Sequence, residues 1–142
     1  MYKRLSKILV VITATFGLLA CATGTVFEQK LQGEGAKRMN AEQVKSHLAG
    51  NTQQWINGGA YFVPDGTVYV KYAGKVFPKT NWTVDSDGKV CLVNPDGFVT
   101  SCSAYFDKDG KVWVVTLEIM GKAQQTEGGV DTILEGNQLS DI

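Results

Sequence analysis

Residues 111–120 read KVWVVTLEIM, and this run carries the clearest secondary-structure signal in the 142-residue chain. Successive side chains of a β-strand point to opposite faces of the sheet. One face of this run therefore carries Trp113, Val115, Leu117 and Ile119, and the other carries Val112, Val114, Thr116 and Glu118. A strand that is apolar on one face and half apolar on the other is typical of a position near the sheet centre, where both faces are partly covered.

Turn signals flank this run and recur toward the N-terminus. The sequence reads PDG at 64–66, DSDG at 85–88, NPDG at 94–97 and DKDG at 107–110. Asp and Asn cap such turns, Pro presets one φ angle, and Gly accepts a positive φ. The runs between the turns are strand-like, at 60–63, 67–72, 82–84, 89–93, 98–106 and 111–120, with a closing strand at 130–134. Short connections favour antiparallel neighbours.

One helix is predicted ahead of the strands. Asn40 is a good N-cap, and Gln43 three residues later completes a capping box. Val44 and Leu48 lie on one face of a short helix over residues 41–49, which must pack on the strands to be stable. The predicted fold is therefore mainly β with one short N-terminal helix, an antiparallel meander curled into a half-barrel or small barrel.

Residues 1–20 have the layout of a secretory signal peptide, with a basic start followed by an apolar segment. The apolar segment, residues 8–20, would span only about 20 Å as a helix. The hydrocarbon core of a bilayer is roughly 30 Å thick. We therefore expect an exported chain without a permanent transmembrane helix at this segment.

The segment ends in a motif that resembles the lipobox of bacterial lipoproteins, Leu18-Leu19-Ala20-Cys21. The resemblance implies cleavage before Cys21 and attachment of diacylglycerol and an acyl chain such as palmitate to that residue. Several acyl chains on one residue are enough for stable membrane anchoring. Ala22 stands where Asp marks inner-membrane retention in enteric lipoproteins, so the resemblance favours the outer membrane, facing the periplasm.

The remaining chain is large enough for one compact domain. Residues 21–38 have few apolar anchors and are expected to form a flexible tether, in which Val26, Phe27 and Leu31 are the residues for any short docking segment. Residues 39–142 are expected to form a single β-rich domain. Without the signal peptide the chain has 11 basic and 14 acidic residues, a net charge of −3, and no basic run, so we expect no nucleic-acid partner.

Cys91 and Cys102 are the two cysteines left after lipidation of Cys21, and disulfides persist in exported proteins. The hairpin register decides whether they meet. A two-residue loop leaves Cys102 diagonal to Cys91, and a three-residue loop turns Cys102 to the opposite face. A four-residue loop pairs them directly. We predict a disulfide and a register or local twist that permits it.

Several segments together resemble a family of small exported bacterial proteins that is classed as a domain of unknown function. The segments are Leu48–Thr52, Tyr61–Thr67, Trp82–Val84, Gly88–Cys91, and Cys102 with its following turn. The resemblance runs from about residue 41 to residue 120. It implies export and the predicted fold, and it implies no activity.

Motifs of known chemistry are weak. His47 is expected in solvent, off the apolar face of the helix, and Asp-rich turns lack the glutamate that an EF-hand loop needs six residues after its glycine. We therefore expect no catalytic residue, metal or cofactor. Aromatic residues are the candidates for lining a ligand cavity, although core packing is their default role: Trp55, Tyr61, Tyr69, Trp82 and Trp113.

The sequence thus favours a lipid-anchored envelope protein that binds a small apolar ligand or an envelope protein, rather than an enzyme. The alternative is an envelope enzyme with an unrecognised active site. A deep pocket that holds two or more convergent polar groups with perturbed protonation would favour the enzyme. A shallow, mainly aromatic groove would favour binding.

Overall fold

The computed structural model describes residues 24–124 and 128–142, so the predictions of a signal peptide and of lipidation at Cys21 lie outside the described residues. One antiparallel sheet dominates the fold. In spatial order its strands are β10 (Lys122–Ala123), β9 (Lys111–Ile119), β8 (Val99–Lys108), β7 (Val90–Val93), β6 (Thr80–Val84), β4 (Thr67–Tyr72), β3 (Gly58–Phe62), β2 (Asn51–Trp55) and β12 (Thr132–Glu135). The predicted β-rich antiparallel meander is confirmed.

Short strands join the two ends of this sheet and extend its sides. β11 (Gly129–Val130) pairs with β9, and β12 pairs with β2 at the far end of the strand order. Because one residue, Asp131, separates β11 from β12, the sheet closes on itself, and we call this curled sheet the barrel. The predicted closing strand is therefore split into two. β1 (Lys37–Arg38) pairs with β8, and β5 (Lys75–Val76) pairs with β4.

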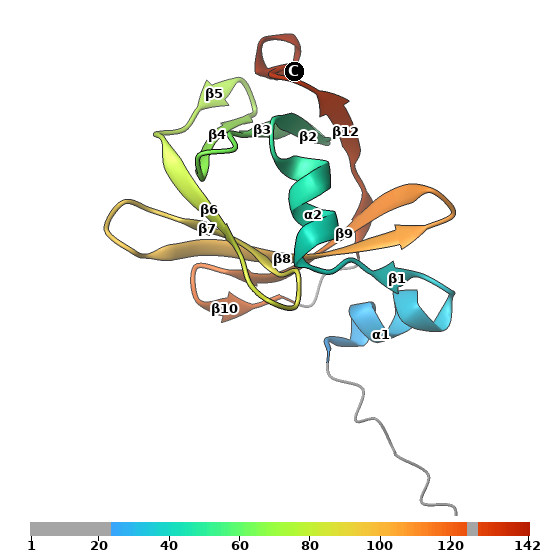
Figure 1. Cartoon of the computed structure of the whole chain (residues 1–142). Helices are drawn as coiled ribbons and strands as arrows, with labels where there is room; N and C mark the ends of the chain where they lie inside the picture. The colour runs from blue at the N-terminus through green and yellow to red at the C-terminus, as the bar shows by residue number, and fades with distance from the viewer. Residues whose placement is uncertain (1–23, 125–127) are drawn as a thin grey trace, which may run out of the picture.

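Helix α2 (Ala41–Leu48) fills one end of the barrel (Figure 1). Its capping box is formed as predicted: Asn40 Oδ1 accepts from the Gln43 N–H, and Gln43 Oε1 accepts from the Asn40 N–H, both at 2.9 Å. Val44 and Leu48 are fully buried in the main core cluster. The helix has a single narrow apolar face, and the barrel interior is where that face is covered.

A second helix, α1 (Val26–Gly33), packs on the outside of the barrel. Leu31 is 5% exposed and contacts a cluster made by β8 and β9, which comprises Ala104, Phe106 and Val115. The outer face of these two strands is thereby covered, while their inner face points into the barrel. In β9 only Val115 is fully buried and most other residues are half-buried, which agrees with the predicted partial cover on both sides.

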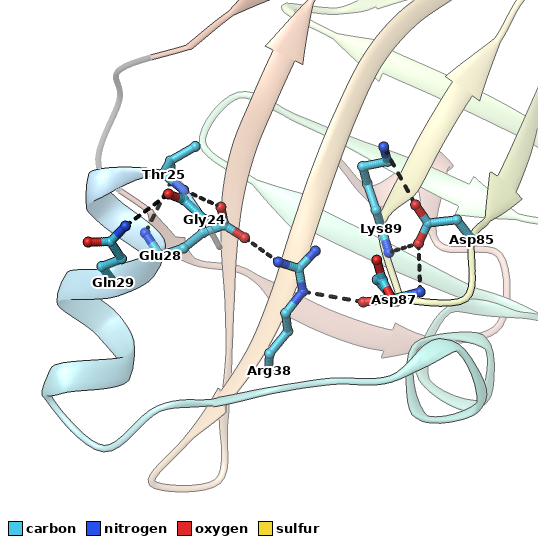
Figure 2. Close-up of polar contacts among 8 residues, drawn as sticks. All are labelled: Gly24, Thr25, Glu28, Gln29, Arg38, Asp85, Asp87 and Lys89. Carbon is cyan, nitrogen blue, oxygen red and sulfur yellow. Dashed lines mark hydrogen bonds and ion pairs between the residues drawn. The ribbon is translucent and has the colours of Figure 1, made fainter. Parts of the chain in front are cut away.

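Polar contacts fix α1 and β1 in place (Figure 2). Thr25 and Glu28 form a capping box at the start of α1, in which the Thr25 N–H donates to Glu28 Oε2. The other carboxylate oxygen, Glu28 Oε1, accepts a hydrogen bond from Arg38 Nη1 at 2.5 Å. Arg38 Nε also donates to the carbonyl oxygen of Asp87, in the turn between β6 and β7. Glu28 is only 3% exposed, so its charge is held by partners on both sides.

The structure differs here from the expected flexible tether, because residues 24–38 are folded onto the barrel. Only the docking segment of Val26, Phe27 and Leu31 was anticipated, and of these Leu31 is the buried anchor. The physical reason is that Leu31 and Ala36 are buried against β8 and β9. A capping box and a buried ion pair further stabilise the docked segment. The remaining element is a short 3-10 helix, η1 (Leu139–Asp141), which contacts β3.

The predicted disulfide is present: Cys91 and Cys102 pair directly across β7 and β8 and are bonded. The hairpin has the three-residue loop, since the Asn94 N–H donates to the Phe98 carbonyl oxygen. That loop alone would turn Cys102 away. A register shift between Leu92 and Val93 adds one residue on β8 and restores the pairing.

Candidate functional site

The barrel encloses a cavity of about 1130 Å³. Its wall is built from inward-facing side chains of seven strands, because alternate residues of each strand point inward. The apolar part of the wall includes Trp55 of β2, Phe62 of β3, Val70 of β4, Leu92 of β7 and Val114 of β9. The volume is slightly above the roughly 300–1,000 Å³ typical of small-molecule pockets.

The two ends of the cavity differ. At the closed end, Phe62 and Tyr105 line the cavity and belong to the same core cluster as Val44 and Leu48 of α2. At the open end, the loops after β4, β7 and β9 form the mouth, where several large apolar side chains are exposed: Tyr72, Phe77, Ile119 and Met120. The molecule therefore presents an apolar opening to a deep interior.

A chain of hydrogen bonds crosses the cavity wall. The Tyr105 hydroxyl of β8 donates to Gln53 Oε1 of β2 at 2.6 Å, and Gln53 Nε2 donates to Asp131 Oδ2 at 2.5 Å. We call Tyr105, Gln53 and Asp131 the polar trio. Tyr105 is 3% exposed and Gln53 is 5% exposed, whereas Asp131 is half-buried. Asp131 is thus the member of the trio that a ligand can reach most readily.

Burial controls the protonation of the trio. Removal from water raises the pKa of Asp131 above its ordinary value, and the hydrogen bond from Gln53 only partly opposes this. Burial also raises the pKa of Tyr105, and the neighbouring Asp131 carboxylate raises it further. Both shifts favour the neutral form, as expected for acids in a low-dielectric site.

The five aromatic residues proposed as ligand-lining do not lie together. Trp55 lines the cavity. Trp82 is buried in the core, where its ring contacts Phe62 edge-on at 5.3 Å and its Nε1 donates to the Val63 carbonyl oxygen. Strand alternation places the other three on the outer face: Tyr61 and Tyr69, which are opposite each other on β3 and β4, and Trp113, which packs with the α1 cluster.

Sequence reasoning missed Gln53 and Asp131 and did not select Tyr105 for the cavity. A glutamine inside a strand and an aspartate between two short strands carry no motif. One signal was present: along β8, Ser101, Ser103 and Tyr105 alternate with Cys102, Ala104 and Phe106. The more apolar face, with Ala104 and Phe106, would be expected to point into the barrel. It instead lies on the outside beneath α1, and the face with Ser101, Ser103 and Tyr105 lines the cavity.

The other residues considered as candidates for catalysis or metal binding are His47 and the turn aspartates, and the turn aspartates have structural roles. His47 is exposed on α2. The turn aspartates accept backbone N–H bonds, as Asp85 does from Asp87 and Lys89 and as Asp65 does from Thr67. Hydrogen bonds from the side chain and the backbone N–H of Thr67 hold the pKa of Asp65 below its usual range. Within residues 24–124 and 128–142, no cluster of three metal-ligating side chains occurs.

A family model described as "Protein of unknown function (DUF995)" matches residues 16–104, which is more than half of the chain. The chain belongs to this family. The DUF995 match includes Leu18–Cys21 and Gln53, and it ends one residue before Tyr105. Searches of curated proteins and of solved structures return no match to the chain. In the part of the chain that the structure describes, no helix has the length and apolar character needed to cross a membrane.

Proposed function

We propose that this DUF995 protein is a lipid-anchored, periplasm-facing binding protein that takes a small apolar molecule into its barrel. The observation that carries this proposal is the cavity of about 1130 Å³, which has a largely apolar wall. Barrels of about eight strands have an interior wide enough to hold one small ligand. The exposed apolar side chains at the mouth, such as Phe77 and Met120, offer such a ligand a first contact.

The anchor half of the proposal rests on the lipobox-like Leu18–Cys21 segment and is supported by the Cys91–Cys102 disulfide, a bond typical of oxidising compartments. Cys21→Ser should abolish incorporation of labelled palmitate and retention in the membrane fraction, whereas wild type takes up the label. Label in the variant, or none in wild type, would contradict lipidation.

The position of α1 supports a mouth that faces away from the membrane. Thr25 and Glu28 are tied through Arg38 to Asp87, in the turn at the closed end of the barrel. Cys21 is three residues before Gly24, a reach of about 10 Å at most. An anchor at Cys21 would therefore hold the closed end toward the bilayer and leave the mouth open to the periplasm.

The polar trio also gives the enzymatic alternative a specific basis. The pocket is deep, and Tyr105 and Asp131 are convergent groups whose pKa values are both raised. A buried carboxyl with a raised pKa is suited to general acid–base catalysis. Binding is nevertheless the better-supported function, because each trio member is already engaged by another, and groups fixed in this way suit the positioning of a ligand by hydrogen bonding.

The binding proposal is tested by filling the cavity. Ser103 lines the cavity from β8 and is half-buried, so Ser103→Phe should place a ring where the ligand would lie. Thr83→Phe is the matched control, because Thr83 is exposed on the outer side of β6. Purified protein should bind an uncharged naphthylamine fluorophore saturably. Ser103→Phe should weaken that binding by about tenfold or more, and Thr83→Phe should leave it unchanged. Equal binding by all three proteins would contradict the proposal.

A further inference from the structure

We propose that the ligand of the barrel is an amphiphile whose polar end donates hydrogen bonds, a protonated amine above all, and that the cavity discriminates against a carboxylate. This inference rests on the proposed function and names its ligand class. It follows from the direction of the hydrogen bonds in the polar trio and from the charges that line the cavity.

The hydrogen bonds of the trio run in one direction. An ionised carboxylate only accepts, so Gln53 must present its Nε2 to Asp131, and this orientation leaves Gln53 Oε1 to accept from Tyr105. The single O–H donor of Tyr105 is thereby used inside the trio. The chain of bonds ends at Asp131, whose other oxygen, Oδ1, has no hydrogen-bond partner among the described residues. The trio therefore offers a ligand an acceptor.

The charge of the cavity points the same way. In the described part of the chain, the charged side chains that line it are Lys79, Asp96 and Asp131. Lys79 and Asp96 are exposed at the mouth and carry opposite charges. Asp131 is half-buried, and no described Lys, Arg or His forms an ion pair with it. An uncompensated carboxylate in an apolar site attracts a cation and repels an anion.

The surroundings of Asp131 explain why a ligand amine would be held well. The raised pKa of this carboxyl reflects its loss of water, which a donor or cation would replace. Charge-assisted hydrogen bonds are roughly twice as strong as neutral ones. A carboxylate ligand would instead place two negative groups together in a site with little water.

The test compares three dodecyl compounds with the same chain: dodecylamine, dodecanol and dodecanoate. Each is titrated, below its micelle concentration and near neutral pH, into purified protein that holds the naphthylamine fluorophore. The amine should displace the fluorophore best and the carboxylate worst, with a difference of about tenfold or more between them. Equal affinities, or a preference for dodecanoate, would overturn this inference. Displacement by dodecanol would still support the proposed function in that case.

Variants separate the interior carboxylate from other charges. Asp131→Asn should bring the affinities for the amine and the carboxylate close together. Asp109→Asn, in the turn at the opposite end of the barrel, should keep the wild-type ratio. Asp96→Asn should also keep it if the discrimination arises inside the cavity rather than at the mouth. A ratio that changes with Asp96 and not with Asp131 would overturn the assignment. If the fluorophore itself does not bind wild type, the proposed function fails first.

Discussion

Gly88→Ala should destabilise the protein far more than Gly97→Ala, although both glycines have a positive φ, +75° and +86°. An alanine at either position adopts the left-handed conformation at a cost of roughly 1 kcal/mol. The surroundings differ. A Cβ at Gly97 meets open space, whereas a Cβ at Gly88 would overlap the carbonyl oxygen of Met39 and lie 3.0 Å from the carbonyl carbon of Asn40. The Gly88 backbone thus supports the start of α2.

The size of the difference follows from what would have to move. The obstructing atoms are backbone, and they lead directly into α2, whose Val44 and Leu48 are fully buried. Relief therefore displaces the helix that closes the barrel or the turn that contacts it, and such overpacking costs about 1–3 kcal/mol. Adding the conformational cost gives about 3 kcal/mol for Gly88→Ala. Gly97→Ala should cost about 1 kcal/mol.

Urea unfolding followed by tryptophan fluorescence measures both values, since Trp82 is 8% exposed in the folded state. The slope of the free energy against urea should be the same for wild type and both variants. Equal destabilisation by the two alanines would refute the reasoning, because it would mean that the turn and α2 do not contact each other closely.

Other perturbations test the outer helix, the disulfide and the trio. Leu31→Ala should lower the free energy of unfolding by about 3 kcal/mol. Val26→Ala, on the same helix but 68% exposed, should lower it by no more than about 0.5 kcal/mol. Equal effects would mean that α1 does not pack on the barrel. Reducing Cys91–Cys102, which are 11 residues apart, should lower the free energy of unfolding by about 3 kcal/mol in the chain-entropy model, and the reductant should not affect a Cys91→Ala/Cys102→Ala variant. The raised pKa of Asp131 means that the folded protein keeps this proton to higher pH than the unfolded chain, so stability should fall as pH rises from 3.8 through the folded pKa. Asp131→Asn should remove that fall and exceed wild type in stability near neutral pH; an unchanged pH profile would contradict the assigned shift.

The elements that sequence reasoning predicted correctly are those with local signals. The capping box of Asn40 and Gln43 marks α2, and the Asp-Gly turns mark the hairpins, because each depends on residues within one turn of chain. The disulfide was predicted from export and cysteine count. Its geometry depends on a register shift next to Val93, which no residue type announces.

The cavity could not be predicted in the same way. Both faces of β8 are covered, one by α1 and one by the barrel interior, so alternation alone does not identify the inner face. The polar trio joins residues 53, 105 and 131, which are brought together only by closure of the sheet. Such long-range contacts follow from topology and leave no local pattern in the sequence.

The most direct test of the central claim is to locate a bound ligand by nuclear Overhauser effects. Isotope-filtered spectra of purified protein with dodecanol should show contacts from the ligand methylenes to the methyl groups of Val70, Leu92 and Val114, which face the cavity. They should show none to the methyl groups of Val115, which is buried on the outer face beneath α1. Contacts confined to outer-face methyl groups, or saturable binding without contacts to the inward ones, would contradict binding inside the barrel.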